Sequence, residues 1–536
     1  MHQNKASTKP TFLAYEPAYT DLQINTLECL LLELVKIQFR VPIMSASSFT
    51  LFSLQGKTKI LHLNWIAFFI SFVVWFNHAP LLLSIQNSLG ISSRETEILL
   101  LLNVALTIPA RVIVGMVVDR LGAKITYSVL LALASLPCFM FAFAQNFEEL
   151  AWARFLLGFI GAGFVVGIRI IGDWFPSSQI GTAEGVYAGW GNFGAAFAAI
   201  SLPGLAYVLG DQEGWRYAIA ITGLIALLYA FVYYQNVENF PPELSGEHSK
   251  QASTMEVSSI SDLFLYMFSL IPLYASLAIL IWKLHAPEFA VLNTLNAGIL
   301  QVLVIVTFLM HAYQLVKTNS IRLSQPVASI YQYRYSQVFI LAITYLITFG
   351  SKLAVLSMLP LFLFNTYAET QQLSMQNAGL LASSFVITNI IARPIGGWLS
   401  DRMGRRLTLF LFSSGLTAGY LLMAFIASDW SLWLTVAIIL FCSIFMQAAE
   451  GAIFAFVPLI RRPITGEVAG IVGAYGNAGA IVFLILYSVV TPSQFFIILA
   501  LCCLSLLLLT LWLEEPRTFI NEIQPDGTVI RIELSS

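Results

Sequence analysis

The sequence has little charge and no regular cysteine pattern. Of its 536 residues, 10% are Asp, Glu, Lys or Arg and 58% are hydrophobic. This apolar share is well above that of an average soluble domain. The five cysteines show neither paired nor metal-ligand spacing, and most lie inside apolar segments, where a thiol packs as a small hydrophobe. The composition therefore predicts an integral membrane protein whose cysteines serve packing.

The motifs of soluble catalysis are missing as well. No His is followed by Glu as a zinc-binding HExxH helix requires. The stretch "LFSLQGKT" ends like a phosphate-binding loop, but Leu51 stands where that loop needs its first glycine. The formal net charge of -2 leaves no basic stripe for nucleic acid. We therefore expect no enzymatic activity, no catalytic residues, no cofactor or metal, and no nucleic-acid partner.

Hydrophobic stretches of roughly 20 residues, enough to cross about 30 Å of hydrocarbon, form two sets of six. The first set covers residues 63–85, 97–118, 125–145, 150–172, 184–209 and 216–235. The second set covers residues 336–364, 377–399, 407–427, 431–458, 467–490 and 493–513. Two further apolar segments, 263–283 and 290–316, lie between the sets. An even number preserves the orientation of the second set, so we expect fourteen spans in preference to a pair lying at the membrane interface.

This plan divides the chain into five parts. They are a partly disordered cytoplasmic extension (1–60), an N-terminal six-helix half (61–236), a central linker with two additional hydrophobic helices (237–335), a C-terminal six-helix half (336–514) and a cytoplasmic tail (515–536). Lys and Arg gather in the loops after the second, eighth and tenth core spans, which places both ends of the core in the cytoplasm. The sequence changes character abruptly after Met44, so a start at Met44 in place of Met1 stays open.

An internal repeat shows that the two halves are copies of one unit. The segment "RVIVGMVVDRLGAK", from Arg111, aligns with "RPIGGWLSDRMGRR", from Arg393, at an offset of 282. The segment "GTAEGVYAGWGNFG" aligns with "GEVAGIVGAYGNAG" at an offset of 285, which matches Asn192 to Asn477. Parallel repeats joined by a polar linker are typical of alternating-access transporters, whose substrate site lies at the midplane between the halves.

The loop after the second helix of each half has the pattern of a gate. Its glycine permits close helix approach, and its aspartate can pair with a neighbouring arginine or a helix N-terminus. The residues are Gly115, Asp119 and Arg120 in the first half and Gly397, Asp401 and Arg402 in the second. This G-x-x-x-D-R-x-G loop resembles the cytoplasmic motif of the major facilitator superfamily.

A sharper resemblance comes from "AGWGNFG" and "GAYGNAG" together with an arginine inside the second helix of each half. This combination resembles the nitrate/nitrite porter family of that superfamily, over nearly all of residues 60–515. The segments "GDWFPSSQIGTAEGVYAGWGNFG" and "QAAEGAIFAFVP" are most similar to the cyanobacterial and plant-type nitrate permeases. The resemblance implies an all-α membrane protein with two pseudo-symmetric six-helix halves.

Arg111 and Arg393 are the main candidates for substrate binding. Each lies eight residues before the loop aspartate, roughly 12 Å inside the end of its helix. A lone charge at such depth costs about 3 kcal/mol to well over 10 kcal/mol, and two nearby cations also repel unless an anion lies between them. Glu450, interpreted as the only clearly intramembrane acid, can serve one arginine but not both. A guanidinium fork suits the planar oxygens of nitrate or nitrite.

The glycines of the signatures predict close helix packing. Gly185 and Gly189 form a G-x-x-x-G pair, and Asn192 returns to the same helix face. Because Asn477 recurs in the same context, we expect both asparagines to donate amide hydrogens to an anion beside the glycines. The family resemblance implies a hydroxyl donor, Tyr345, and two aromatic walls, Phe349 and Phe164. We also place two further signature glycines in the site, Gly191 and Gly476.

Five other polar residues lie in or near the spans. Glu450 and His78 are candidates for proton coupling, the alternatives being a hydrogen-bonded helix contact for each. Lys352 is expected to extend outward to the membrane surface. Arg169 and Asp173, four residues apart, are interpreted as a local ion pair outside the substrate site.

The resulting hypothesis is a secondary transporter that imports nitrate, and also nitrite, across a bacterial inner membrane. Import against an inside-negative potential costs about 2.3 kcal/mol per 100 mV, so proton symport is favoured. Electroneutral nitrate/nitrite exchange is the first alternative, followed by transport of another small anion and by a nitrate receptor without transport. The expected partners are the two anions, protons and the lipid bilayer.

Overall fold

The computed structural model describes residues 50–210, 212–241, 256–287, 291–323, 332–515, 519–523 and 529–533. All the elements below belong to the unit Ala46–Ser536. The predictions about Met44 and Cys29 concern residues outside the described ranges. The four described cysteines carry free thiols, three of them buried and one partly buried, as expected for packing residues.

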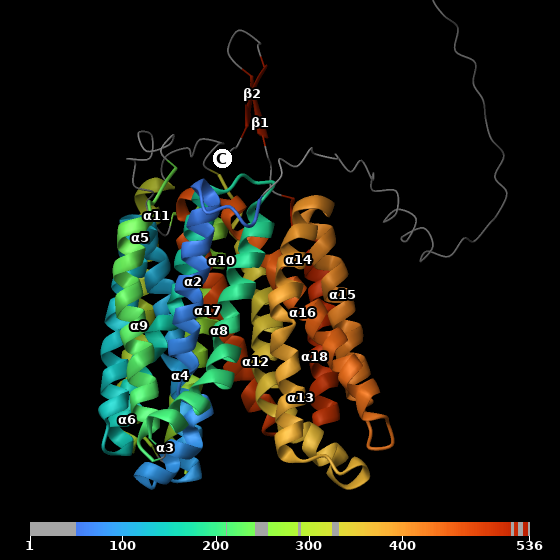
Figure 1. Cartoon of the computed structure of the whole chain (residues 1–536). Helices are drawn as coiled ribbons and strands as arrows, with labels where there is room; N and C mark the ends of the chain where they lie inside the picture. The colour runs from blue at the N-terminus through green and yellow to red at the C-terminus, as the bar shows by residue number, and fades with distance from the viewer. Residues whose placement is uncertain are drawn as a thin grey trace, which may run out of the picture. The chain divides into compact units, whose positions relative to one another are not determined.

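Helices carry almost all of the described chain (Figure 1). The N-terminal half contains α2 (Gly56–Phe76), η1 (Ala79–Leu81), α3 (Leu82–Leu89), α4 (Ser93–Ala105), α5 (Thr107–Phe143), α6 (Phe147–Leu157), η2 (Gly158–Ala162), α7 (Gly163–Trp174), α8 (Ile180–Leu209) and α9 (Gly214–Asn236). Two helices follow, α10 (Ile260–His285) and α11 (Thr294–Arg322). The C-terminal half contains α12 (Tyr335–Gln371), α13 (Met375–Ile387), α14 (Asn389–Met403), α15 (Arg405–Ala424), α16 (Leu432–Ile460), η5 (Arg462–Ile464), α17 (Thr465–Tyr487) and α18 (Pro492–Thr510).

Thirteen described helical stretches are long and apolar enough to cross a membrane. One of them, Arg94–Phe143, has 50 residues, far more than the roughly 20 that one crossing needs. Gly122 breaks it, with φ at 78°, a value that suits glycine because it has no Cβ. This stretch therefore holds two of the predicted spans, and the thirteen stretches account for all fourteen predicted segments.

Helix breaks occur at equivalent places in the two halves. α4 passes into α5 at Leu106, and α13 passes into α14 at Thr388, which is the same repeat position. Pro109 explains the first break, because it lacks an N–H and its ring crowds the preceding turn. At the second break the Thr388 hydroxyl donates to the Phe385 carbonyl at 3.1 Å, a local bond that bends helices. Each break precedes its repeat arginine by five residues.

The two inserted helices attach to the core through α10. This helix packs against α12 and α17, whereas α11 packs mainly on α10. Tyr266 of α10 stacks on Tyr335 of α12 with ring centroids 4.5 Å apart. α11 leaves large apolar side chains exposed along most of its length, as expected for a helix that faces lipid.

A small β hairpin lies near the C-terminus, outside the all-α membrane fold. Strand β1 (Phe519–Ile523) pairs antiparallel with β2 (Val529–Glu533), with Phe519 opposite Glu533. The sequence analysis expected only a cytoplasmic tail over these residues. The hairpin leaves the membrane fold unchanged, because it follows the last apolar helix (Figure 1).

Candidate functional site

Arg111 is a buried cation held by backbone oxygens. Its side chain is 1% exposed. Nε donates to the Gly161 carbonyl at 3.2 Å, and Nη1 donates to the Gly473 carbonyl at 2.6 Å. Gly473 belongs to α17, so this arginine of the first half already reaches the second. Among the described residues, no carboxylate forms an ion pair with Arg111, and its charge is not neutralised.

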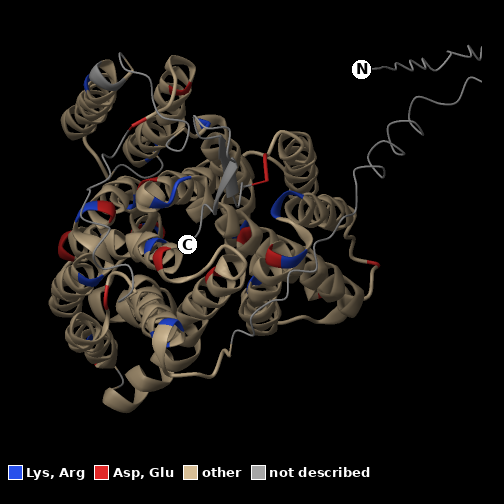
Figure 2. Ribbon diagram, turned by 90° about the horizontal axis from the view of Figure 1, so that it is seen from above, with Lys and Arg blue, Asp and Glu red and all other residues tan. Residues whose placement is uncertain are grey.

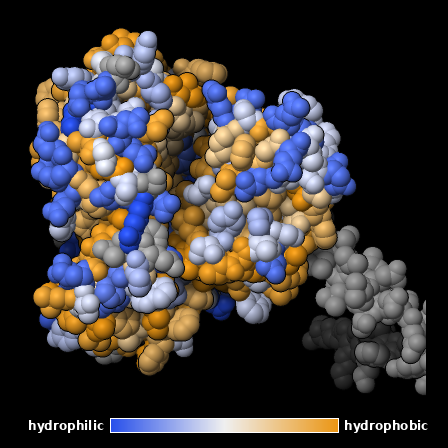
Figure 3. Space-filling model, turned by 90° about the horizontal axis from the view of Figure 1, so that it is seen from below, coloured by the Kyte–Doolittle hydropathy of each residue, from blue (hydrophilic) through white to orange (hydrophobic). Residues whose placement is uncertain are grey.

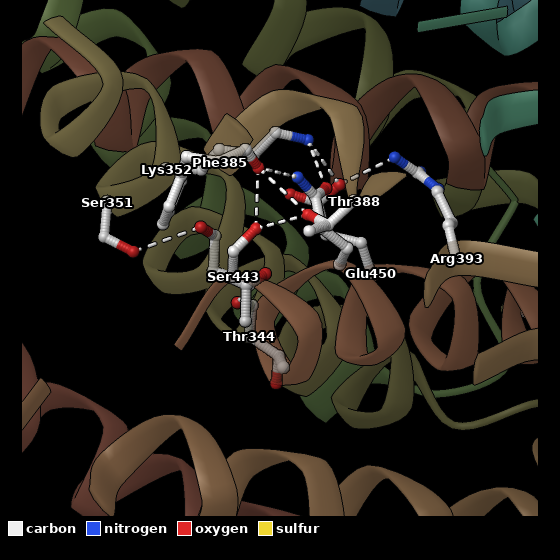
Figure 4. A network of polar contacts seen from close by, with 10 residues as sticks. Thr344, Ser351, Lys352, Phe385, Thr388, Arg393, Ser443 and Glu450 are labelled. Atoms are coloured by element: carbon white, nitrogen blue, oxygen red, sulfur yellow. Dashed lines mark hydrogen bonds and ion pairs between the residues drawn. The ribbon is translucent and has the colours of Figure 1, made fainter. Parts of the chain in front are cut away.

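Arg393 has the same depth and a different partner. Its Nη1 donates to Oε2 of Glu450 at 2.6 Å. The same carboxylate oxygen accepts from Nζ of Lys352 at 3.0 Å (Figure 4). Nε and Nη2 of Arg393, which together form one bidentate donor edge, have no hydrogen-bond partner in the described structure.

The network around Glu450 corrects the expectation for Lys352. This lysine does not extend to the membrane surface: it is 5% exposed and also donates to Gln447 at 2.7 Å. The reason is its position on α12, which faces α16 rather than lipid. Glu450 therefore pairs with Arg393 and Lys352 together. Arg111 is left without an acid, which agrees with the prediction that Glu450 can serve one arginine but not both.

One aromatic ring links the two arginines. The Phe164 ring centroid lies 5.5 Å from the guanidinium carbon of Arg111 and 5.5 Å from that of Arg393. Tyr345 stacks on Phe349 with ring centroids 4.9 Å apart. The two guanidinium carbons are thus separated by at most twice the 5.5 Å that lies between each of them and the Phe164 ring centroid. The three aromatic residues that the resemblance implied lie beside the arginines.

A fourth aromatic residue completes this cluster. Phe454 of α16 meets Phe164 edge to face at 4.6 Å and Tyr345 at 4.8 Å. The guanidinium carbon of Arg393 lies 5.9 Å from its ring. The sequence analysis missed it, although it stands four residues after Glu450 and therefore on the same helix face.

The asparagines of the two signatures are buried near this cluster without bonding to the arginines. Asn192 is 6% exposed and Asn477 is 0% exposed. Both polar side-chain atoms of Asn477 lack a partner in the described structure. Asn389, one turn before Arg393, is likewise 1% exposed with both side-chain atoms unpartnered. Buried amides normally bond, so these groups are available for a ligand.

The signature glycines pack each half against the arginine helix of the other. A Cβ on Gly185 of α8 would lie 2.6 Å from the Arg393 carbonyl oxygen, and one on Gly470 of α17 would lie 2.5 Å from that of Arg111. A Cβ on Gly189 of α8 would likewise lie 2.9 Å from the Asn389 carbonyl oxygen. A residue with a side chain does not fit at these contacts. The glycines of the repeat therefore allow α8 to pack on α14 and α17 to pack on α5.

The other two signature glycines differ from each other. A Cβ on Gly476 would meet Tyr345 at 2.6 Å, so this glycine makes room for the aromatic wall. A Cβ on Gly191 would meet Phe68 at 2.1 Å. Phe68 belongs to α2 of the same half, so Gly191 serves packing inside that half and does not face the arginines directly.

The gate aspartates bind across the halves at one end of the molecule. Asp119 of α5 accepts from the backbone N–H groups of Gly466 at 2.9 Å and Glu467 at 2.7 Å, at the start of α17. Asp401 of α14 accepts from those of Gly181 at 2.9 Å and Thr182 at 2.7 Å, at the start of α8. Both aspartates thus contact a helix N-terminus of the other half, one of the two alternatives that the sequence offered.

The gate glycines allow this approach. A Cβ on Gly115 would lie 2.3 Å from the Gly466 carbonyl oxygen, and one on Gly397 would lie 1.8 Å from that of Gly181. The Arg402 guanidinium packs over Trp398, 4.4 Å from its ring, whereas Arg120 lies exposed at the end of the same loop in the first half. Seen from above, basic and acidic positions lie close together around the helix ends (Figure 2).

Arg169 belongs to this gate as well as to the predicted local pair. It binds Asp173 at 2.7 Å as expected, and its Nε also lies 2.9 Å from Oδ1 of Asp119. On the other side, Arg405 pairs with Asp401 at 3.3 Å. The halves are therefore joined at this end, while the opposite end shows a groove between two lobes (Figure 3).

His78 lies outside the arginine cluster. It is 0% exposed, packs edge-on against Phe141 at 6.3 Å, and has no hydrogen-bond partner for either ring nitrogen in the described structure. The described structure thus shows no hydrogen bond for the helix-contact alternative. Nearby Arg154, which the sequence analysis missed, is fully buried and donates to the Trp75 carbonyl and to Asn103.

A second intramembrane acid was also missed. Glu184 stands at the start of a predicted span, where a carboxylate normally reaches water, yet it is 1% exposed. α8 begins four residues earlier, and its packing on α14 covers the side chain. Glu450 is therefore not the only acid within the membrane fold.

The chain resembles known transporters over most of its length. The family model of the Major Facilitator Superfamily matches residues 65–362 and 338–529. The nitrate/nitrite transporter NrtP of Picosynechococcus sp. is 41% identical over 83% of this chain and 87% of its own length. NrtP of Nostoc punctiforme is 38% identical over 87% of this chain and 94% of its own length.

Solved structures agree on the fold. The transporter FucP in its outward conformation superposes with a TM-score of 0.58 at 13% identity, covering 85% of this chain and 99% of its own. At that identity the likeness concerns the fold alone. The chain is a multi-pass membrane protein of the major facilitator superfamily, and within it belongs to the family represented by the cyanobacterial nitrate/nitrite transporters.

Proposed function

We propose that this protein imports nitrate and nitrite by alternating access, with one anion held between Arg111 and Arg393. The observation that carries the proposal is the unpartnered Nε–Nη2 edge of Arg393, buried beside a second arginine that has no acid. A bidentate edge matches two oxygens of a planar anion. The names of the two cyanobacterial relatives support the choice of anion.

The charges favour a monovalent anion at this place. Of three buried cations, Arg111, Arg393 and Lys352, the last two are ion-paired in the described structure, both with the carboxylate of Glu450. Excess positive charge inside a membrane protein is costly, and a bound anion reduces that cost. Phe164 and Phe454 keep the cluster apolar, which strengthens each electrostatic contact. Asn477 and Asn389 supply amide groups that have no hydrogen-bond partner among the residues that the structure describes.

The gate contacts support transport over a receptor role. Two matched aspartate contacts close one end, and the repeat that creates them is the basis of alternating access. By the excess of Lys and Arg, the closed end faces the cytoplasm of a bacterial cell, with the protein in the inner membrane and both core ends inside. The opposite end, with the groove between the two lobes, then faces outward (Figure 3).

The test is uptake of labelled nitrate into proteoliposomes, with and without an inward proton gradient and with and without internal nitrite. We expect uptake under a proton gradient. An absence of flux under every condition would refute transport, and flux that requires internal nitrite would replace symport by exchange. Exchange of one monovalent anion for another moves no net charge, which makes it the specific alternative.

A further inference from the structure

Glu184 is a buried acid that the anion site does not use. It is 1% exposed, and neither of its carboxylate oxygens has a hydrogen-bond partner in the described structure. An ionised carboxylate without a partner is expensive in such a place, whereas a neutral carboxylic acid is tolerated. The environment therefore suits a side chain that exchanges a proton.

Its position connects it to the anion site. The next residue, Gly185, packs directly on the Arg393 backbone, with its would-be Cβ 2.6 Å from the carbonyl oxygen. In the described structure, no hydrogen bond joins the Glu184 carboxyl to Arg393, and two donors of Arg393 have no partner. An anion at Arg393 and an ionised Glu184 would repel each other, because both are negative and lie beside the same helix segment.

Its position also connects it to the gate. One turn earlier on α8, the N–H groups of Gly181 and Thr182 hold Asp401. Three residues later, Tyr187 donates to the carbonyls of Gly163 and Phe164 beside the aromatic cluster. Glu184 therefore lies on the helix that joins the closed gate to the substrate site.

The helices packed against α8 carry Arg393 and other charged or titratable groups. Lys59 and His62 of α2, Arg402 of α14, and Arg216, Tyr217 and Tyr234 of α9 are among them. The others have contacts of their own. They are Asp401 of α14 bound to Arg405, Glu450 of α16 bound to Arg393, Lys57 of α2 bound to Gln179, Arg169 bound to Asp173 on α7, and Tyr229 and Tyr233 of α9 bound to Leu63 and Asn64.

The internal repeat shows that this acid is not part of the symmetric framework. The equivalent position in the second half is Ala469, although the neighbouring glycines match, Gly185 with Gly470. Both glycines make the same packing contact. The fold therefore builds the α17–α5 contact without an acid, and a carboxyl at this position in the first half alone needs a separate reason.

We infer that Glu184 carries the proton that is transported together with the anion. The carboxylate takes up one proton from the outer solution while the site faces outward, which removes the negative charge that opposes an anion at Arg393. Anion and proton then favour each other's binding by the same factor, as linkage requires. After the gate opens, the proton leaves Glu184 for the cytoplasm and the anion leaves Arg393.

This inference rests on the proposed function and makes it more specific. Accumulation should therefore follow the pH gradient. It also fixes the sign of the pH effect: nitrate affinity falls as the pH rises, because the ionised carboxylate opposes the anion.

The experiment compares wild type with Glu184→Gln in proteoliposomes. The amide keeps the size of the side chain and cannot exchange the proton. We expect Glu184→Gln to lose gradient-driven nitrate accumulation by about 10-fold or more while exchanging labelled for unlabelled nitrate within about twofold of wild type. Glu450→Gln is the contrasting variant, because loss of the Arg393 partner should lower accumulation and exchange together.

Equilibrium binding provides the second measurement. Nitrate affinity of the purified wild type should weaken with rising pH, and that of Glu184→Gln should not change with pH. Gradient-driven accumulation by Glu184→Gln equal to wild type would overturn the inference, as would loss of nitrate binding in both Glu184→Gln and Glu184→Ala. A wild type that exchanges nitrate but does not accumulate it in response to the pH gradient would also overturn the inference. That result would leave anion transport intact. An absence of wild-type flux altogether would refute the proposed function itself.

Discussion

The two halves hold equivalent arginines by different means. Within the described part of the chain, Arg111 of the first half donates to two backbone carbonyls, those of Gly161 and Gly473. Arg393 of the second half binds the carboxylate of Glu450, which also binds Lys352. The surrounding backbone is nearly the same, because Gly470 and Gly185 pack on the two arginine helices in matching contacts. The repeat thus fixes where the cations lie, and the side chains around them have diverged.

The difference assigns separate tasks to the halves. A carbonyl-bound arginine keeps its full charge and has no competitor for an anion. An arginine with a fixed acid has one edge occupied and one edge presented in a defined direction. We expect the first to contribute mainly charge and the second mainly orientation, and the substitutions below test that comparison.

The largest effect is expected from replacing the arginines themselves. Arg111→Lys and Arg393→Lys each replace a planar fork by a single point of charge, which cannot bind two oxygens at once. Each should lower kcat/KM for nitrate uptake by about 100-fold or more, a loss of roughly 2.7 kcal/mol in transition-state binding. Arg94→Lys, at an exposed position, is the matched control and should leave uptake unchanged. Normal kinetics in both core variants would remove the two-arginine site.

Removal of the acid should come second. Glu450→Gln leaves Arg393 and Lys352 without their carboxylate partner, and breaking a buried ion pair costs about 3–5 kcal/mol. We expect a lower melting temperature in detergent together with reduced uptake. The double variant Glu450→Gln with Lys352→Met should regain part of the stability, because it removes one unpaired cation. An unchanged melting temperature in Glu450→Gln would show that the network does not stabilise the second half.

The gate should respond with intermediate effects. Asp119→Asn and Asp401→Asn weaken matching contacts with the N-termini of α17 and α8, each made by two backbone N–H groups. Loss of a charged acceptor costs about 1.5–3 kcal/mol, so both variants should open the closed end more often. The measurement is labelling of a buried Ser400→Cys reporter by a thiol reagent from that end. Faster labelling in only one variant would indicate an asymmetric gate.

The smallest effect is expected where the inserted helices meet the gate. Tyr266 of α10 donates to Oε1 of Glu467 at 2.7 Å, directly beside the Asp119 contact. Tyr266→Phe removes this bond and should change the uptake rate about two- to threefold. Tyr274→Phe is the control, because Tyr274 contacts His311 of α11 and lies away from the gate. Equal effects of the two substitutions would show that α10 influences stability rather than the gate.

The sequence predicted the parts of the site that the repeat marks twice. Arg111 with Arg393, Gly185 with Gly470, and Asp119 with Asp401 recur at constant offsets, so their shared environment followed from one alignment. The aromatic wall of Phe164, Tyr345 and Phe349 came from family resemblance, since such residues are common in any membrane core.

Features present only once were harder to predict. Lys352 lies inside a predicted segment longer than one crossing needs, and Glu184 lies at the start of a predicted span. In both cases hydropathy alone cannot tell a buried side chain from one that reaches water. Their burial depends on which helices pack beside them, α16 in one case and α14 in the other. The partner of Arg393 was uncertain for the same reason, because one carboxylate within reach of two arginines does not reveal which it binds.

The central claim is that the two arginines share one anion. Isothermal titration of purified protein with nitrate tests it most directly, through the number of anions bound per chain. The account predicts one nitrate per chain in wild type and no measurable binding in either Arg111→Lys or Arg393→Lys. Two nitrates per chain, or wild-type affinity in one of the variants, would contradict it.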